Sequence, residues 1–428
     1  MISSDIFDIT EPTPEDKGIM RFEHHTYRPE NGSDINSSGD VRINITKTDL
    51  ITYPSDSYLL IEGRLTKTDG TAFADAAKIT LVNNGLMFLF KSIKYTLSGR
   101  VIEHLNNPGQ ATTMLGLLKY PRGFAKSLGL NQLWYKDTED TLTDENLGFN
   151  KRQNYIIKKP ATKGSFSFIV PLKHIFGFCE DYDKVLYGFS HTLTLTRDST
   201  DNNAIVRDGG DVGKISLTKI EWLMPHVIPS NAVELPFLNT IKDKSEIPVA
   251  FMSRQCETTS VDRSKAFSWT LPSASAPNFP NYIIVGFQTK RDNDQAKNPA
   301  VFDHCNVTTI KVVVGGEEYP ESDYELSFAN NQYARAYRDA AVLGIKLFGL
   351  NELVTDPSIA ADEYKDLYPL FVFDVSKRTE RLKLSSVDMR IEAKFNANVP
   401  EGTLAYALII SDKICSFKSD GSSLKVIE

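Results

Sequence analysis

The sequence predicts an all-β fold, and three features of the chain support this prediction. Short segments in which apolar and polar residues alternate recur throughout, as expected for strands that bury one face. Turn-forming pairs such as Asn84-Gly85 and Ser98-Gly99 separate several of these segments. Helical character is clearest in only two stretches, residues 110–119 and 334–343. Many short strands with regularly spaced turns are typical of a β-sandwich or barrel.

Length and composition indicate a globular protein with two domains. A chain of 428 residues is too long for one ordinary core, and its 41% hydrophobic and 24% charged residues are ordinary for soluble proteins. The net charge of −7 argues against a surface built entirely to cover nucleic acid, although it permits a local basic patch. We expect no membrane insertion, because no apolar run approaches about 18 residues. The acidic N-terminus lacks the features of a signal peptide, so we expect synthesis inside a cell.

The four cysteines predict neither a zinc site nor a disulfide framework. They lie far apart in the sequence and include no Cys-x-x-Cys pair. We expect reduced and mostly buried thiols. The four residues are Cys179, Cys256, Cys305 and Cys415.

Residues 1–40 are polar and rich in turn-forming residues, which predicts an extended N-terminal arm outside the first domain. Within this segment, His24 and His25 are adjacent. Neighbouring residues of a strand point to opposite faces, so we expect a solvated pair rather than a metal site.

A series of strands is predicted from residue 41 onwards. Residues 41–46 alternate between apolar and polar, and residues 57–66 form an apolar run that begins after Pro54. Pro108-Gly109 is a start signal for the helix at residues 110–119. The other strands expected in this half are residues 79–82, 88–90, 93–99, 164–171 and 191–197.

Residues 120–160 are less regular and are predicted to form a long surface excursion. The segment contains an acidic run, residues 137–145, and a basic run, residues 151–159, which we interpret as solvated loop. The basic run includes Tyr155, and a basic segment around an aromatic residue is also the best local candidate for a polyanion contact. The cations of this candidate site are Lys151, Arg152, Lys158 and Lys159.

A seam between two domains is predicted near the middle of the chain. Residues 214–224 have the β-branched, increasingly apolar character of a strand that becomes buried, with Trp222 as a candidate core residue. Proline donates no ladder hydrogen bond, so Pro225 and Pro229 are expected to end this strand. We therefore predict a first domain at residues 41–228 and a second at residues 229–428.

The second half repeats the strand pattern of the first. Residues 58–67 and 282–290 are both Tyr-led apolar strands that follow a proline and end in Thr-Lys. Further pairs, in the same order along both halves, are residues 93–99 with 310–316, residues 165–172 with 370–376, and residues 191–197 with 387–395. A predicted helix follows the second strand of this series in each half. We infer a duplicated domain of about eight strands, and eight strands in two sheets predict a pair of tandem antiparallel jelly rolls.

Three runs of residues resemble a known family: Ile220-Glu-Trp-Leu-Met-Pro-His-Val, Tyr368-Pro-Leu-Phe-Val-Phe-Asp-Val-Ser-Lys377 and Ala405-Tyr-Ala-Leu-Ile-Ile-Ser-Asp412. They are similar to double jelly-roll major capsid proteins, especially those of Polinton (Maverick) elements and related DNA viruses. The resemblance covers nearly all of the chain after residue 40. It implies two jelly rolls in one chain, three chains in a pseudo-hexagonal capsomer, and capsomers in an icosahedral shell.

The sequence contains no recognisable catalytic, metal-binding or cofactor-binding motif. Phosphate-binding and dinucleotide-binding glycine patterns, Gly-x-Ser-x-Gly and His-Glu-x-x-His are absent. His304-Cys305 lacks partners at zinc spacing. Trp134-Tyr135 and Trp222 could form a sugar platform, but we interpret them as core or interface residues. We therefore predict no enzyme, no cofactor and no metal.

These observations favour a structural capsid subunit. We expect self-association into a homotrimer that contacts neighbouring capsomers, with penton and minor capsid proteins as further partners and at most an indirect contact with nucleic acid. The expected location is the virion capsid. One alternative is a tandem β-sandwich that binds or cleaves carbohydrate, because fold alone does not determine function. Another is a domesticated host protein that keeps the fold without forming shells.

Overall fold

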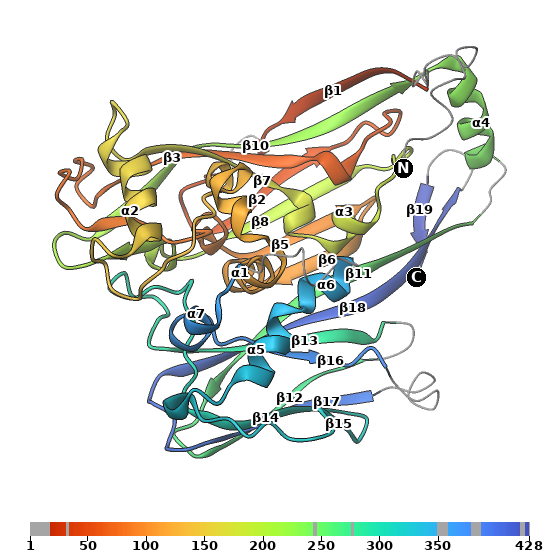
Figure 1. Ribbon diagram of the computed structural model, residues 1–428. Helices are drawn as coiled ribbons and strands as arrows, with labels where there is room; N and C mark the ends of the chain where they lie inside the picture. Colours follow the sequence, from red (N-terminus) through yellow and green to blue (C-terminus); the bar gives the residue numbers. More distant parts are fainter. Residues whose placement is uncertain are drawn as a thin grey trace, which may run out of the picture.

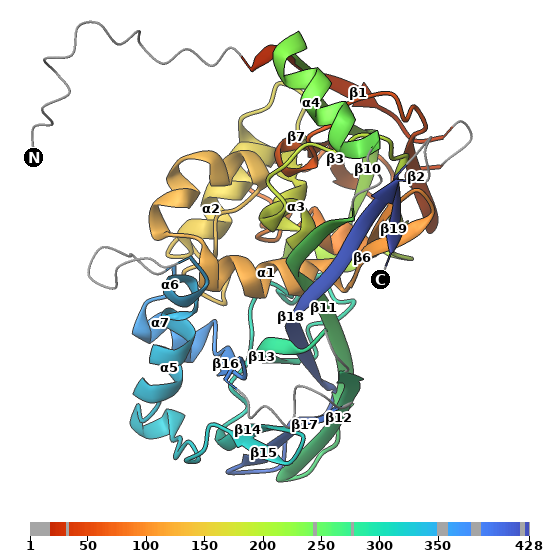
Figure 2. The ribbon, with the colours of Figure 1, turned by 90° about the vertical axis from the view of Figure 1, so that its right-hand side faces the viewer.

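The computed structural model describes residues 18–30, 34–242, 246–274, 278–348, 358–377, 387–419 and 424–427. Within them the chain forms two β-sandwiches, one above the other in Figure 1. Figure 2 shows the helices α1, α2, α5, α6 and α7 gathered on one flank, while β11 and β18 run along the other. The helices are α1 (Pro108–Lys119), α2 (Leu147–Gln153), α3 (Gly177–Asp181), α4 (Asn231–Lys242), α5 (Ala334–Ala341), α6 (Leu343–Phe348) and α7 (Ala361–Asp366).

The first sandwich consists of two four-stranded antiparallel sheets. One sheet has the strand order β1-β10-β3-β7 and the other has the order β2-β8-β5-β6. A separate two-stranded ribbon is formed by β4 (Ile79–Leu81) and β9 (Ile205–Arg207). The sandwich strands are β1 (Ile19–Tyr27), β2 (Gly39–Ile45), β3 (Tyr58–Lys67), β5 (Phe90–Leu97), β6 (Arg100–Asn106), β7 (Ser165–Pro171), β8 (His191–Arg197) and β10 (Gly213–Pro229).

The second sandwich repeats this topology. Its sheets have the orders β11-β18-β13-β16 and β12-β17-β14-β15, and β19 adds to β18. In both sandwiches, therefore, the first, eighth, third and sixth strands form one sheet, and the second, seventh, fourth and fifth form the other. The strands are β11 (Ile247–Val261), β12 (Ala266–Ala274), β13 (Pro280–Thr289), β14 (Val307–Val314), β15 (Glu317–Tyr319), β16 (Phe371–Asp374), β17 (Val387–Phe395), β18 (Thr403–Ser419) and β19 (Leu424–Ile427).

This topology confirms the predicted fold of two tandem eight-stranded jelly rolls. The four pairs of segments that echo each other in the sequence occupy equivalent strands: β3 and β13, β5 and β14, β7 and β16, and β8 and β17. The helix predicted after the second pair is also present in both halves, as α1 and α5.

The cores follow from the period-two pattern of the strands. In β2, for example, Val41, Ile43 and Ile45 are buried while Arg42 is exposed. Trp222 is fully buried, and its ring meets that of Tyr95 edge-on at 6.1 Å. Trp134 is buried as well, so both tryptophans pack in the interior, as expected, rather than forming a sugar platform.

The strand at the seam does not end at its first proline, so this prediction is wrong. β10 continues through Pro225 to Pro229. The carbonyl of Pro225 accepts a hydrogen bond from the Tyr53 N–H, which places its nitrogen on the β3 side of the strand. The ladder between β3 and β10 has already finished at Leu223. Because no ladder bond is needed from residue 225, the proline is tolerated. The domain boundary predicted between residues 228 and 229 lies at the end of β10, and we retain it as a proposal.

The predicted N-terminal arm is also wrong for part of its length. Residues 19–27 form β1, which pairs with β10 at the edge of the first sheet, and residue 39 begins β2. Both faces of β1 are largely exposed, so its sequence lacks the apolar alternation that reveals the other strands. Residues 1–17 of the predicted arm lie outside the described part of the chain.

Residues 120–160 contain more regular structure than the loop we expected. They include α2 and a π-helical turn, Asn154–Lys158, and they bury Phe149, Ile156 and Ile157. Among the helices of the described residues, none has the length and apolarity needed to cross a bilayer.

Candidate functional site

Polar groups of the two jelly rolls meet at the contact between them. β11 is an edge strand of its sheet, so alternate backbone N–H groups point away from β18. Carboxylates of the first jelly roll accept these donors. The N–H of Arg254 donates to Oε1 of Glu103 at 2.7 Å, and the N–H of Met252 donates to Oδ2 of Asp181 at 2.7 Å. An exposed strand edge can pair with another chain. Here two carboxylates bind N–H groups along the edge of β11.

Glu103 joins three segments of the chain. Besides the Arg254 N–H, its carboxylate accepts the N–H groups of Gly177 at 3.1 Å and Phe178 at 3.0 Å, at the start of α3. Burial raises the pKa of Glu103, while the charge of Arg254 and the backbone donors oppose the rise. A buried carboxylate is costly unless its oxygens are fully bonded, so Glu103 favours one arrangement of β6, α3 and β11.

A cluster of charged side chains surrounds this contact. The guanidinium of Arg254 binds the Glu180 carboxylate and donates to the carbonyl of Lys173 at 3.2 Å. Lys119, at the end of α1, binds the same carboxylate. Burial and, to a smaller extent, the charge of Arg254 lower the pKa of Lys119 to about 6. Because burial opposes the charged forms of these side chains, the cluster is weak evidence of net stabilisation.

Gly177 permits the two jelly rolls to approach closely at this contact. A Cβ atom built on residue 177 would lie 1.7 Å from the carbonyl oxygen of Met252, which is well inside van der Waals contact. Nearby, the Nζ of Lys413 donates to the carbonyl of Ile102 at 2.9 Å and joins β18 to β6. The backbones of both rolls are therefore in direct contact.

A second contact between the rolls is built around Asp137. Arg152 is fully buried and donates to both carboxylate oxygens of Asp137, at 2.8 and 2.9 Å. Asn298 of the second jelly roll donates to the same carboxylate at 2.9 Å, and the Tyr368 hydroxyl donates to the carbonyl of Asp137 at 2.8 Å. One ion pair of the first roll thus anchors two segments of the second.

Two further side chains extend this second contact. Arg291 bridges the rolls by binding Asp140 of the first at 2.9 Å and Asp303 of the second at 2.7 Å. Gln295 is buried, and its side chain both accepts from and donates to the backbone of Gly213, at 2.9 and 2.8 Å. Polar contacts therefore join the two rolls at this second place as well.

Comparison with known proteins is consistent with this architecture. The family model described as a double jelly roll-like domain matches residues 79–415. The chain belongs to this family. No curated protein sequence matches the chain.

Three solved structures that are similar to this chain come from two virophages and Faustovirus. A chain of the Sputnik virophage superimposes with a TM-score of 0.62 and 9% identity, covering 100% of this chain and 92% of that one. The Faustovirus major capsid protein gives a TM-score of 0.56, 11% identity and coverage of 99% and 92%. The mavirus major capsid protein gives 0.52, 12% identity and coverage of 100% and 93%. At these identities the comparison shows the fold.

The double jelly roll places the predicted polyanion residues in different surroundings. Arg152 is buried in its ion pair with Asp137, so the prediction that it contacts a polyanion is wrong. Lys151 and Lys159 are exposed and Lys158 is half-buried. Their contact with a polyanion remains a proposal for these three cations.

Other expectations about chemistry concern metals and thiols. No group of three or more His, Cys, Asp or Glu side chains in the described ranges has a geometry that could hold a metal ion. His304 stacks on Phe328 with ring centroids 4.4 Å apart. All four cysteines are free thiols, and Cys305 alone of the four is not fully buried.

Sequence reasoning missed the residues that join the two rolls. Glu103 and Arg254 each interrupt an apolar strand with a charge, which was the available signal. These two residues lie 151 positions apart in the chain, however, and no local pattern connects them.

Proposed function

We propose that this chain is a structural major capsid protein whose trimers form the pseudo-hexagonal capsomers of an icosahedral shell. One observation carries the proposal: two copies of the same jelly-roll topology are joined in one chain by a buried polar contact. A trimer of such chains presents six similar jelly rolls, and closed symmetry is the rule for homo-oligomers. The similar virophage and Faustovirus chains, two of which are named as major capsid proteins, support the same role.

The buried contact matters because a capsomer in a shell must transmit force without changing shape. If the rolls were joined only by a flexible linker, three chains would not present a fixed hexagonal outline. Glu103 and Asp137 instead hold the two rolls at two separate places. The proposal includes the finer expectations of a virion location, neighbouring capsomers, penton and minor capsid proteins as partners, and similarity to the capsid proteins of Polinton elements. It includes no catalytic role.

Light scattering and electron microscopy test this function. We expect purified protein to elute at three times the mass of the chain, and negative-stain images to show particles with a hexagonal outline. Shells or sheets of such particles should appear at higher protein concentration. A monomer that persists at millimolar concentration, with no particles in micrographs, would exclude the capsid role.

A further inference from the structure

The first strands of the two jelly rolls are equivalent, but within the described residues only β11 has an edge whose N–H groups are bound by side chains. β1 and β11 each lie at the edge of a sheet and pair with the last strand of their roll. The outward N–H groups of β11 donate to Asp181 and Glu103, as described above. Along β1, the N–H groups of Phe22, His24 and Thr26 point away from β10, because Pro225 and Val227 use the opposite side of β10. No hydrogen bond from these three groups to the described residues is present.

The pairing registers show which residues correspond. Tyr58 of β3 and Tyr282 of β13 lead the matching apolar runs of these equivalent strands, and they pair with Leu223 and Ile410, respectively. On the other side of those residues, Leu223 pairs with Thr26, and Ile410 pairs with Arg254. Thr26 therefore corresponds to Arg254, and two residues earlier His24 corresponds to Met252. The free donors of β1 occupy the positions of the bound donors of β11.

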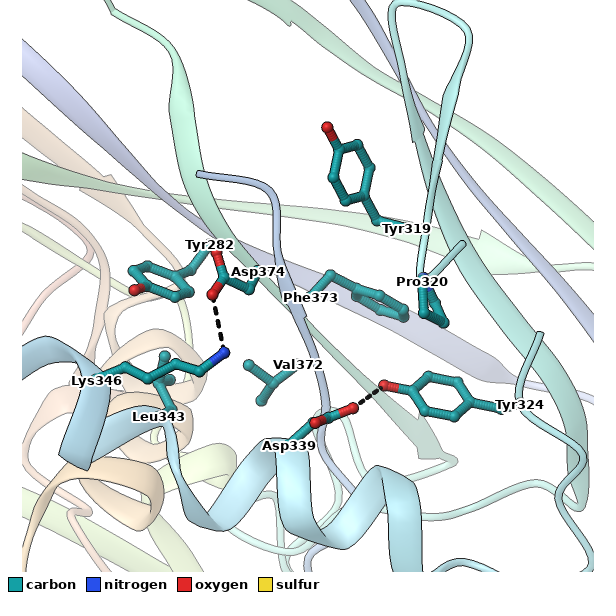
Figure 3. Close-up of a pocket in the computed structure, with 10 residues that line it drawn as sticks. All are labelled: Tyr282, Tyr319, Pro320, Tyr324, Asp339, Leu343, Lys346, Val372, Phe373 and Asp374. Atoms are coloured by element: carbon teal, nitrogen blue, oxygen red, sulfur yellow. Dashed lines mark hydrogen bonds and ion pairs between the residues drawn. The ribbon is translucent and has the colours of Figure 1, made fainter. Parts of the chain in front are cut away.

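The second jelly roll carries an open pocket where the first carries Glu103. Tyr95 and Val312 are equivalent in β5 and β14, and they pair with Glu103 and Tyr319. Tyr319 lines a cavity of about 130 Å³ between the β14–β15 hairpin, β16 and the helices α5 and α6 (Figure 3). Among the described residues, no strand covers this face of the second roll in the way that β11 covers the corresponding face of the first.

The pocket has the chemistry needed to accept a strand edge. Figure 3 shows two carboxylates at its wall: Asp374, bound to the Nζ of Lys346 at 2.8 Å, and Asp339, which accepts from the Tyr324 hydroxyl at 2.6 Å. Two carboxylates also receive β11 in the first roll. Carboxylate oxygens on one surface therefore match N–H groups of β1 that make no hydrogen bond within the described residues.

We propose that the free edge of β1 docks against this pocket on the second jelly roll of a neighbouring copy. The contact inside each chain is then repeated between chains. Such a head-to-tail contact closes into a ring when the rotation permits, and three two-roll chains would alternate internal and external contacts around one ring. Backbone pairing at a strand edge is an established mode of association. This inference rests on the proposed capsomer, since it requires a second copy.

Cross-linking between two differently labelled copies tests the docking. One preparation carries Thr26→Cys and the other Tyr319→Cys, and the two are mixed, allowed to assemble and treated with a short bis-maleimide. We expect a covalent dimer in the mixture at several times its yield in either variant alone or in the wild-type protein, whose cysteines provide the background. A dimer formed by Thr26→Cys alone would show that β1 pairs with itself and would overturn the proposal.

A proline substitution tests the role of the strand edge. In Thr26→Pro the lost N–H is one that makes no ladder bond to β10, so the fold should tolerate it. We expect the trimer to dissociate at a protein concentration at least ten times higher than for the wild type, while the melting temperature of the monomer shifts little. Thr26→Ala keeps the N–H and is the matched control, with no change in dissociation.

The outcomes separate this inference from the proposed function. Light scattering could show trimers while no cross-link forms and the Thr26→Pro trimer dissociates at the wild-type concentration. That result would refute the β1 docking and leave the capsid role standing. Monomers alone would refute both. A cross-link together with weakened Thr26→Pro trimers supports both.

Discussion

The two jelly rolls share one topology but fill the centre of their cores with different chemistry. In the first roll, Tyr95, His191 and Trp222 pack together, and the Tyr95 hydroxyl bonds Nδ1 of His191 at 2.8 Å. The registers place Val312, Met389 and Ile409 at the equivalent positions of the second roll, where all three are buried. The fold therefore requires bulk and apolar surface at these positions, and the polar aromatic group is an addition specific to the first roll.

The difference between the cores should be most visible when the largest side chain is removed. Trp222→Ala leaves a large cavity in the first roll and should destabilise it by about 3–5 kcal/mol. Hydrogen exchange resolved by mass spectrometry should show faster exchange in the first roll than in the second. The indole N–H has no hydrogen-bond partner in the described residues, so Trp222→Phe should cost much less. Equal losses for both variants would contradict this account of the core.

Acid should weaken the first roll more than the second. Burial lowers the pKa of His191 to about 3 and that of His174 to about 3. Between pH 3 and their unfolded pKa near 6.5, these side chains bind protons only in the unfolded chain. Stability is therefore full above about pH 6.5 and falls as the pH drops, by about 1.4 kcal/mol per unit for each histidine.

Hydrogen exchange at pH 7 and pH 4.5 measures this effect in each roll. The first roll should lose protection at the lower pH while the second changes little. Met389 replaces His191 in the second roll, so His191→Met is the matched variant and should flatten the pH dependence of the first. Equal acid sensitivity in the two rolls would contradict the prediction.

The smallest expected loss of stability comes from removing the hydrogen bond between Tyr95 and His191. Tyr95→Phe removes the buried hydroxyl that bonds His191 and should destabilise the first roll by about 1–2 kcal/mol. Chemical denaturation monitored by fluorescence measures the loss. Tyr364→Phe removes a comparable buried bond, to the carbonyl of Leu370 in the second roll, and is the control. If Tyr95→Phe destabilises the wild-type protein but not the His191→Met variant, the lost hydrogen bond is responsible for the loss of stability.

Much of the fold was predictable because the period of two in half-buried strands is a local signal. Equivalent strands such as β3 and β13 retain enough of this residue pattern for the repeat to be recognised in the sequence. The residues of β1 were assigned to an arm outside the first domain because neither face of this strand is buried. We expected Pro225 to end its strand. The strand continues because the ladder between β3 and β10 has already finished at Leu223, and this register cannot be seen in the sequence.

The polar contacts were much less predictable. The acidic and basic runs were both interpreted as solvated loop, yet Arg152 and Asp137 from these runs bury each other completely. Composition alone does not show which charges of a run face inward. Glu103 and Arg254 depend on a contact between domains, and the sequence offers no pairing signal over that separation. Trp222, a single large apolar residue in a strand, was correctly expected in the core.

The pairing of first with last strands has a consequence for the order of events during translation. The Tyr27 hydroxyl meets His226, 199 residues later, so the first roll closes only after most of the half has left the ribosome. Once it has closed, Glu103 and Asp181 are in place before β11 emerges. A released chain truncated after residue 246 should therefore already resist proteolysis in the first roll. The first half then serves as the surface on which the second half begins to fold.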